Sequence, residues 1–240
     1  MTYGHSHTIE AWGEFACFTS PLKVERWSYP VPTPSAARGI FDAIYVNRHE
    51  FRWQIESIEI LSPPRYIALM RNEVKEKGPS ENEILAALAG GGTIRTILAD
   101  ADSQASGDPG KGRTQRQTMA LRDVRYRITA AVNPLPQFRD KRHVYGDIFA
   151  RRLKRGQQFT QPCFGCREFA AWWGEPSCAP RWPGDLDAGW MLYDVFDLGL
   201  ERQGEPTDMA TVSLFRARVK QGLLKVPSWD SPDVKKVGRL

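Results

Sequence analysis

The sequence lacks the long apolar segment that a membrane-spanning helix requires. No window of the 240-residue chain approaches 18 consecutive apolar residues, whereas a helix needs about 20 of them to cross a bilayer. The opening MTYGHSHTIE has neither the basic segment nor the apolar segment of a secretory signal. We therefore expect a cytoplasmic protein without a membrane partner.

Cysteine is also scarce, and its spacing argues against a metal site. The chain has four cysteines: Cys17, Cys163, Cys166 and Cys178. Cys163 and Cys166 form a single CxxC pair, but a structural zinc site needs a second pair at comparable spacing. No spacing enforces zinc binding by His5, His7 and His49. We therefore predict reduced thiols, no metal and no other cofactor.

Several signatures of catalysis are missing as well. The sequence contains no Walker phosphate-binding loop, no GxSxG nucleophile elbow and no GxGxxG dinucleotide fingerprint. No pair of carboxylates stands out as the acid and base of a glycosidase or as ligands of a two-metal nuclease. These absences exclude the commonest nucleotide-binding and hydrolase classes that a motif can identify.

Basic residues, in contrast, are in slight excess and gather in the second half. Lys and Arg total 33 against 28 Asp and Glu, which gives a net charge of +5 and a pI near 9.1. They cluster in residues 111–127, 139–155 and 216–239. This pattern favours an anionic partner, although many unrelated proteins share the same balance.

The apolar pattern of the first half predicts a β-α-β-β order followed by another strand. Strands are predicted over residues 7–18, 51–62, 65–74 and 118–132. Thr33 is placed to cap a helix that begins at Pro34 and ends near Tyr45. Within this helix, Arg38 and Asp42 have the i, i+4 spacing of an ion pair. The order is that of an α+β, ferredoxin-like (RRM-type) sheet.

Two further features bear on the predicted sheet. Residues 100–113 have no apolar side chain larger than alanine, so we expect an exposed loop. The apolar face of the strand over 118–132 changes phase near Arg122 and Asp123, which predicts a bulge or turn there.

The stretch NPLPQ, residues 133–137, is a natural domain boundary. We therefore predict a ferredoxin-like domain over residues 1–135. A smaller, mostly β domain over 136–240 would contain a helix, a basic tail and two strands. These strands are predicted over residues 189–198 and 211–219.

The basic stretch RDKRHVYGDIFARRLKRG, residues 139–156, permits two interpretations. Asp147 in the first turn and Arg151 to Arg155 in the last turn suit the dipole of an ordinary solvated helix. The segment RDKRH precedes that helix in a predicted loop, so the helix dipole does not explain its basic side chains. Composition alone does not decide between a solvated face and a nucleic-acid contact.

Three stretches, read together, resemble family five of the CRISPR-associated proteins, subtype d, a member of the RAMP superfamily found in prokaryotic type I-C systems. They are SYPVPTPSAARGIFDAIY (28–45), RNEV (71–74) and DIFARRLKRGQQFTQPCFGCREF (147–169). The likeness runs over roughly residues 8–220, and the three blocks occur in the family's order. It implies a ferredoxin-like N-terminal domain with a smaller, mostly β C-terminal domain. It also implies a metal-independent endoribonuclease that cuts CRISPR precursor RNA in the repeat hairpin and retains the 5′ handle in the surveillance complex.

The resemblance also implies a catalytic set, which consists of a tyrosine at the end of the first helix and a Lys-His pair before the second-domain helix. Tyr45 matches the tyrosine directly. Ungapped counting puts Val144 and Tyr145 in the places of the pair, whereas a two-residue insertion puts Arg142 and His143 there, with Lys141 adjacent. We favour His143, with Tyr145 as the alternative.

The same interpretation gives each catalytic group a chemical role. Histidine exchanges protons at neutral pH, and Lys141 or Arg142 can stabilise charge on the phosphorane. Tyr45 would orient the attacking 2′-OH. The expected ends are a 2′,3′-cyclic phosphate and a 5′-hydroxyl. RNA contacts are predicted for Arg38, Arg113, Arg116, Arg142, Arg151, Arg152 and Lys154.

The predicted partners are CRISPR repeat RNA, the mature crRNA and the other subunits of the type I-C complex. Two other readings stay open. One is a catalytically silent RNA-binding subunit, and the other is binding of duplex DNA through the same basic surfaces.

Overall fold

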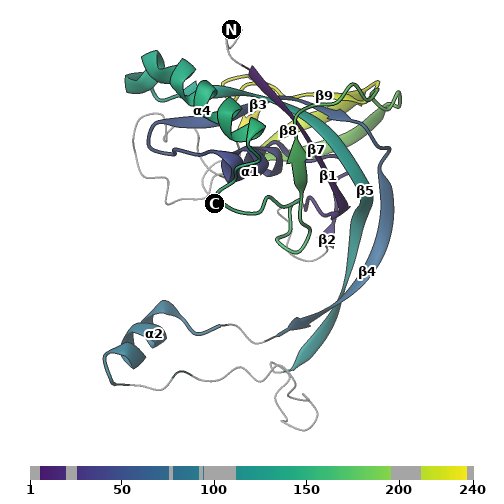
Figure 1. Ribbon diagram of the computed structural model, residues 1–240. Coiled ribbons are helices and arrows are strands. Elements are labelled where there is room, and N and C mark those ends of the chain that lie inside the picture. Colours follow the sequence, from purple (N-terminus) through teal and green to yellow (C-terminus); the bar gives the residue numbers. More distant parts are fainter. Residues whose placement is uncertain are drawn as a thin grey trace. The chain divides into compact units, whose positions relative to one another are not determined.

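The computed structural model describes residues 6–19, 26–75, 78–91, 94, 112–195 and 212–236. Within these ranges the chain is α+β, which confirms the predicted class: an antiparallel sheet is combined with three α-helices and one 3-10 helix (Figure 1). Packing divides the chain into two units, Met1–Ile67 with Met119–Leu240, and Ala68–Thr118.

The strands are β1 (Ser6–Ala16), β2 (Arg26–Trp27), β3 (Phe51–Ile60), β4 (Arg65–Val74), β5 (Arg113–Pro134), β6 (Trp172–Gly174), β7 (Leu186–Asp194), β8 (Ser213–Lys220), β9 (Leu223–Lys225) and β10 (Lys235–Lys236). The helices are α1 (Pro34–Ile44), α2 (Glu81–Leu88), the 3-10 helix η1 (Pro136–Lys141) and α4 (Arg142–Lys154). All the strands predicted from alternation are present, with ends that differ by a few residues. Residues 196–198 and 211 of two predicted strands lie outside the described residues.

Strand β5 is the centre of the sheet. The order is β10-β8-β9-β3-β5-β1-β6, while β2 and β4 pair with β5 and β7 pairs with β8. Ile128 of β5 lies opposite Ile9 of β1 on one side and Ile58 of β3 on the other, and all three are fully buried. The predicted irregularity is present, because Asp123 has a φ of +52° in the middle of β5.

Helix α1 begins as the sequence predicts. The Thr33 hydroxyl accepts the Ala36 N–H at 3.1 Å, and Pro34 occupies the first turn, where its missing N–H costs nothing. The apolar residues that share one face of α1 all lie in the core: Ala37, Ile40, Phe41 and Ile44. The burial of this face fixes the helix on the sheet.

The prediction of a loop for RDKRH was wrong. Its first three residues belong to η1, and Arg142 and His143 lie in the first turn of α4. Asp147 is therefore in the second turn, not the first. The start was missed because α4 has no side-chain cap and follows directly on a 3-10 helix that begins at Pro136.

The strands of the two predicted domains belong to one hydrogen-bonded sheet. β6 pairs with β1, and β9 pairs with β3. The residues of the predicted basic tail also include Trp229, which is 1% exposed and lies in the core. The boundary predicted near residue 135 stays a prediction.

The second unit, Ala68–Thr118, holds the distal parts of β4 and β5 and the short helix α2. Ser80 caps α2 in a reciprocal capping box with Glu83, and no residue of α2 is buried. Of the loop predicted over 100–113, residues 100–111 lie outside the described residues. Among the helices that the structure describes, none is long and apolar enough to cross a membrane.

A buried ion pair ties α1 to β7. The Arg38 guanidinium donates to both carboxylate oxygens of Asp194, and the two side chains are only 10% and 2% exposed. Asp42 lies 3.9 Å away on the same helix, at the predicted i, i+4 spacing. Because both charges have left water, each depends on the other for compensation.

We expect Asp194→Asn to destabilise the protein by about 3 kcal/mol, because it leaves the buried Arg38 charge with only the more distant Asp42 carboxylate as counter-ion. The matched control is Asp187→Asn, also in β7, which removes an exposed pair with Arg216 (47% and 46% exposed). The control should cost less than about 1 kcal/mol. Urea unfolding followed by circular dichroism measures both, and equal midpoints for the two variants would contradict the prediction.

Candidate active site

Tyr45 is held at the C-terminal end of α1. Its backbone N–H donates to the Phe41 carbonyl at 2.9 Å, and its own carbonyl accepts the Trp53 indole N–H at 2.8 Å. Its ring lies 5.5 Å from that of Phe51. The phenol is half-buried, so it is fixed in place and still reaches the surface.

An aromatic cluster brings α4 to the same place. The rings of Phe41 in α1 and Phe149 in α4 stack at 5.3 Å with an interplanar angle of 12°. Trp53 of β3 packs against both, at 5.1 and 4.6 Å. Such contacts add about 0.5–1.5 kcal/mol each beyond burial. They set the middle of α4 against α1 and β3.

Tyr145 of α4 thereby enters the Tyr45 neighbourhood. Its ring stacks on Phe51 at 4.8 Å, so that Phe51 lies against both tyrosines. Its hydroxyl donates to Glu50 Oε2 at 2.6 Å. Glu50 was not identified from the sequence, because nothing in the local pattern shows that the turn before β3 puts its carboxylate beside two phenols.

Both phenols keep their protons at neutral pH. Burial raises the pKa of Tyr45, and the Glu50 carboxylate raises it further, while Arg152 and Arg151 act in the opposite direction. Burial, followed by the hydrogen bond to Glu50, raises the pKa of Tyr145 strongly. Each hydroxyl is therefore a hydrogen-bond donor rather than a base.

Arg152 joins α4 to the end of α1. Its Nε donates to the Ile44 carbonyl at 2.7 Å, and its guanidinium lies 4.1 Å above the Phe159 ring. Phe159 in turn donates its backbone N–H to the Ala43 carbonyl at 2.7 Å. The Arg152 guanidinium is therefore held at the Ile44 carbonyl, and Ile44 is the residue before Tyr45. The neighbouring Arg151 and Lys154 are exposed.

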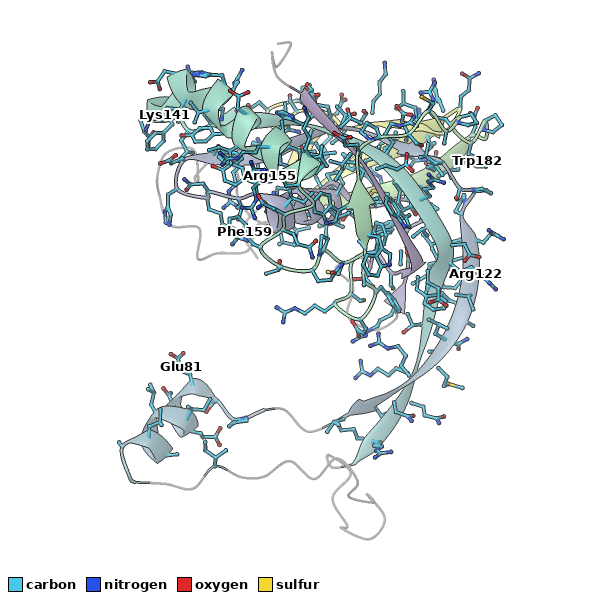
Figure 2. All side chains as sticks on the ribbon, viewed as in Figure 1. Glu81, Arg122, Lys141, Arg155, Phe159 and Trp182 are labelled. Carbon is cyan, nitrogen blue, oxygen red and sulfur yellow. The ribbon has the colours of Figure 1, made fainter. Side chains whose placement is uncertain are left out.

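The other predicted catalytic residues lie at the start of α4. Figure 2 shows Lys141 at one end of this helix and Arg155 at the other. Lys141 is exposed, with its ammonium 5.3 Å above the Phe138 ring, and His143 is also exposed. At about 100° per residue, His143 lies about 200° around the helix from Tyr145. The structure thus brings together Tyr45 and Tyr145, and it places His143 on another side of α4.

The predicted RNA-contacting arginines differ in their surroundings. Arg38 is bound by Asp194 inside the fold, so it is better explained as a structural residue than as an RNA contact. Arg113 and Arg116 are exposed on β5 within the unit Ala68–Thr118. Arg142 is partly buried in the first turn of α4.

The histidines and cysteines do not gather into a metal-binding group. Among the described residues, no cluster of three or more His, Cys, Asp or Glu side chains could hold a metal ion. His7 packs its ring against Trp53 at 5.9 Å and Phe149 at 5.1 Å, and its Nε2 lies 2.9 Å from the place of a Cβ added to Gly146. His5 lies outside the described residues.

Known proteins resemble this chain over nearly its whole length. The sequence model of the CRISPR-associated protein family Cas_Cas5d matches residues 8–227. A CRISPR pre-crRNA endoribonuclease Cas5d from Thermus thermophilus is 36% identical over 92% of this chain and 90% of its own. Another Cas5d endoribonuclease, from Mannheimia succiniciproducens, is 36% identical over 95% of this chain and 97% of its own.

Solved structures share the fold. A functionally uncharacterized protein from Streptococcus mutans superposes with a TM-score of 0.60 at 18% identity, over 96% of both chains. A second crystal structure, of a CRISPR-associated protein, gives the same TM-score at 16% identity and the same coverage.

The Tyr145–Glu50 contact predicts a pH-dependent effect of Tyr145→Phe. At pH 7 the variant should be less stable by about 1 kcal/mol, because it loses one hydrogen bond. Unfolded tyrosine ionises near pH 10, whereas folded Tyr145 holds its proton, so its contribution is full below pH 10 and falls as the pH rises further. The difference in the free energy of unfolding between the wild type and Tyr145→Phe should therefore narrow between pH 9 and 11.5, as measured by urea unfolding. A constant difference would show that Tyr145 is not a raised-pKa group.

Proposed function

The chain belongs to the Cas5d family of CRISPR-associated proteins, and from this membership we propose that it is the endoribonuclease that cuts CRISPR precursor RNA. It acts within the repeat hairpin, without a metal, and keeps the 5′ handle of the product as a subunit of a type I-C surveillance complex in the prokaryotic cytoplasm. Two relatives at 36% identity over nine-tenths of the chain, both named pre-crRNA endoribonucleases, support this.

We also propose that the first part of the sheet is a ferredoxin-like unit. The strand order β3-β5-β1-β6 supports it, together with the position of α1 between β1 and β3 and of α4 between β5 and β6 along the chain. A β-α-β-β-α-β order of this kind characterises the ferredoxin-like fold.

The observation that carries the active-site proposal is the convergence of Tyr45, Glu50 and Tyr145 beside Arg152 at the end of α1. A protonated Tyr45 donates a hydrogen bond that orients the 2′-OH or stabilises the developing phosphorane charge. Arg151 and Arg152 supply positive charge for this phosphate, and Lys141, at the other end of α4, supplies it for a different phosphate of the RNA. Glu50 is held by the Tyr145 hydroxyl and lies beside Tyr45, so its carboxylate is the proposed acceptor of the 2′-OH proton.

The reaction is a transesterification that needs no water. The 2′-oxygen loses its proton and bonds to the adjacent phosphorus, while the bond between that phosphorus and the 5′-oxygen breaks. The leaving 5′-oxygen takes up a proton. The products are a 2′,3′-cyclic phosphate and a 5′-hydroxyl, and DNA, which lacks the 2′-OH, is no substrate.

Two residues are candidates for protonating the leaving oxygen. Tyr145 shares the Tyr45 neighbourhood, and its placement supports the ungapped match to the family pattern. His143 has the better intrinsic pKa for proton exchange, but it reaches the same phosphate only if the RNA passes over the N-terminal end of α4. The position beside Tyr45 favours Tyr145, which is 3% exposed and donates to Glu50, so it acts as the donor when RNA takes the place of Glu50 in that bond.

Binding of the repeat requires charge beyond the cut site. The basic residues proposed to contact RNA phosphates are the exposed Arg113, Arg116, Arg151 and Lys154 and the partly buried Arg142 and Arg152. One alternative is a catalytically silent RNA-binding subunit, and another is a subunit that also binds duplex DNA. The same basic residues would bind the nucleic acid in either case.

Incubation of the pure protein with its repeat RNA in EDTA should give one specific cut. A 2′-deoxy substitution at a single nucleotide, the one that precedes the scissile phosphate, should abolish it, because the nucleophile is then missing. Tyr45→Phe should slow single-turnover cutting by at least about 100-fold and leave RNA affinity within a few-fold. Tight binding with no cut by the wild type would establish the silent-subunit alternative.

A comparison of His143→Ala with Tyr145→Phe separates the two proton donors. We expect Tyr145→Phe to lower the single-turnover rate by at least about 10-fold and His143→Ala to lower it by much less, since general acid catalysis contributes about 10²–10⁴-fold. The rates are measured at saturating protein, with circular dichroism as a check of folding. The opposite ranking would assign the role to His143.

A further inference from the structure

A cleft of about 750 Å³ runs along α1 and has no role in the chemistry proposed above. One wall is α1 itself, and the other is the segment 160–167, which follows α4. Its volume lies in the range of about 300–1,000 Å³ typical of ligand sites. All its lining residues belong to the unit Met1–Ile67 with Met119–Leu240.

The lining suits a polar, anionic ligand. Ser35 and Thr160, which carry hydroxyl groups, line it, and Arg167 is the charged residue among the lining residues that the structure describes. None of the described residues that line the cleft carries a carboxylate. An RNA segment would therefore meet donors and one cation without electrostatic repulsion.

Gly39 lines the cleft at a position where the fold itself does not require glycine. It lies in the middle of α1, where glycine is less favourable than alanine. Its φ is not positive, and a Cβ built on it would meet no atom within 4 Å. Folding alone would thus favour a side chain at this position. Glycine instead leaves the helix backbone open to the close approach of a ligand.

The cleft ends beside the proposed catalytic residues. Ala43 and Thr160 line it, and Ala43 accepts the N–H of Phe159, the residue under the Arg152 guanidinium. Tyr45 is two residues beyond Ala43 on α1. A nucleotide in the cleft would therefore lie near the same end of α1 as one whose phosphate lies at Tyr45.

We propose that the α1 cleft binds an unpaired nucleotide of the repeat RNA next to the scissile phosphate, and that Gly39 is required because the nucleotide packs on the helix backbone. The proposal rests on the function proposed above. Unpaired nucleotides are those whose edges proteins can read by hydrogen bonds, as the Ser35 and Thr160 hydroxyls would do. The cleft thus reads the sequence beside the hairpin, while the exposed arginines grip its backbone.

The test substitution is Gly39→Leu, whose Cβ meets no atom within 4 Å and whose longer side chain would occupy the cleft. Its urea midpoint should match or exceed that of the wild type, since leucine is a better helix former than glycine. Its Kd for repeat RNA should rise at least about 10-fold. The matched control is Gly78→Leu, because a Cβ at Gly78 also meets no atom within 4 Å and Gly78 lies outside the cleft. The control should bind and cut as the wild type does.

The nucleotide is identified by combining Gly39→Leu with abasic repeats. In wild type, one abasic position beside the hairpin should weaken binding, and the same position should have no further effect in Gly39→Leu, because the contact is already lost. Additive losses at every position would overturn the proposal. So would unchanged affinity and cutting by Gly39→Leu.

The thiol of Cys163, which lines the cleft, gives a second measurement on the unsubstituted chain. Repeat RNA should slow its alkylation several-fold, as followed by peptide mass spectrometry, while the exposed Cys178 serves as the reference. Equal rates with and without RNA would count against the cleft. If wild type cuts the repeat and Cys163 is unprotected, the cleft proposal fails alone; if wild type does not cut, the proposed function fails first.

Discussion

The stacking of Phe41 on Phe149 is the contact on which the candidate site depends. Neither helix carries the site alone: α1 supplies Tyr45, and α4 supplies Tyr145 and Arg152. Trp53 packs against both rings and also holds the Tyr45 carbonyl, so one side chain of β3 fixes the helix end and the helix contact together. A loss of packing here would change the separation of the phenols before it exposed the sheet.

Helix α1 is also fixed by charge. Arg38 is bound by Asp194 of β7, which ties the helix to a strand late in the chain. Arg152, by contrast, binds a backbone carbonyl with one nitrogen and stacks on Phe159, so its guanidinium is oriented without a carboxylate partner among its described contacts. Two arginines of one unit therefore differ in purpose. One neutralises a buried acid, and the other is oriented by a backbone carbonyl and an aromatic ring.

The sequence predicted most reliably what depends on neighbours along the chain. The cap at Thr33, the apolar stripe of α1, the Arg38–Asp42 spacing and the strand positions are local patterns, and the structure confirms them. What it did not predict depends on contacts far along the chain. Arg38 meets Asp194 from 156 residues away, and Glu50 acquires a role only because α4 packs beside it.

The start of α4 was a different case. It was missed because a 3-10 helix leads into it without a capping side chain, so no local signal marked the junction. The register of the Lys-His pair stayed open for a related reason. Counting along the chain cannot decide between His143 and Tyr145, and the structure adds that the two side chains lie on different sides of α4.

The pairing of β3 with β9 bears on how the protein is made. The Ile60 N–H donates to the Gly222 carbonyl at 2.8 Å, and the Val226 N–H donates to the Glu56 carbonyl at 2.9 Å. During synthesis, at about 5–20 residues per second, β3 thus emerges long before the strand that covers its edge. Until then its open edge can pair with other nascent chains. High contact order of this kind slows folding, so the interval before residue 226 leaves the ribosome is when the chain most needs a chaperone.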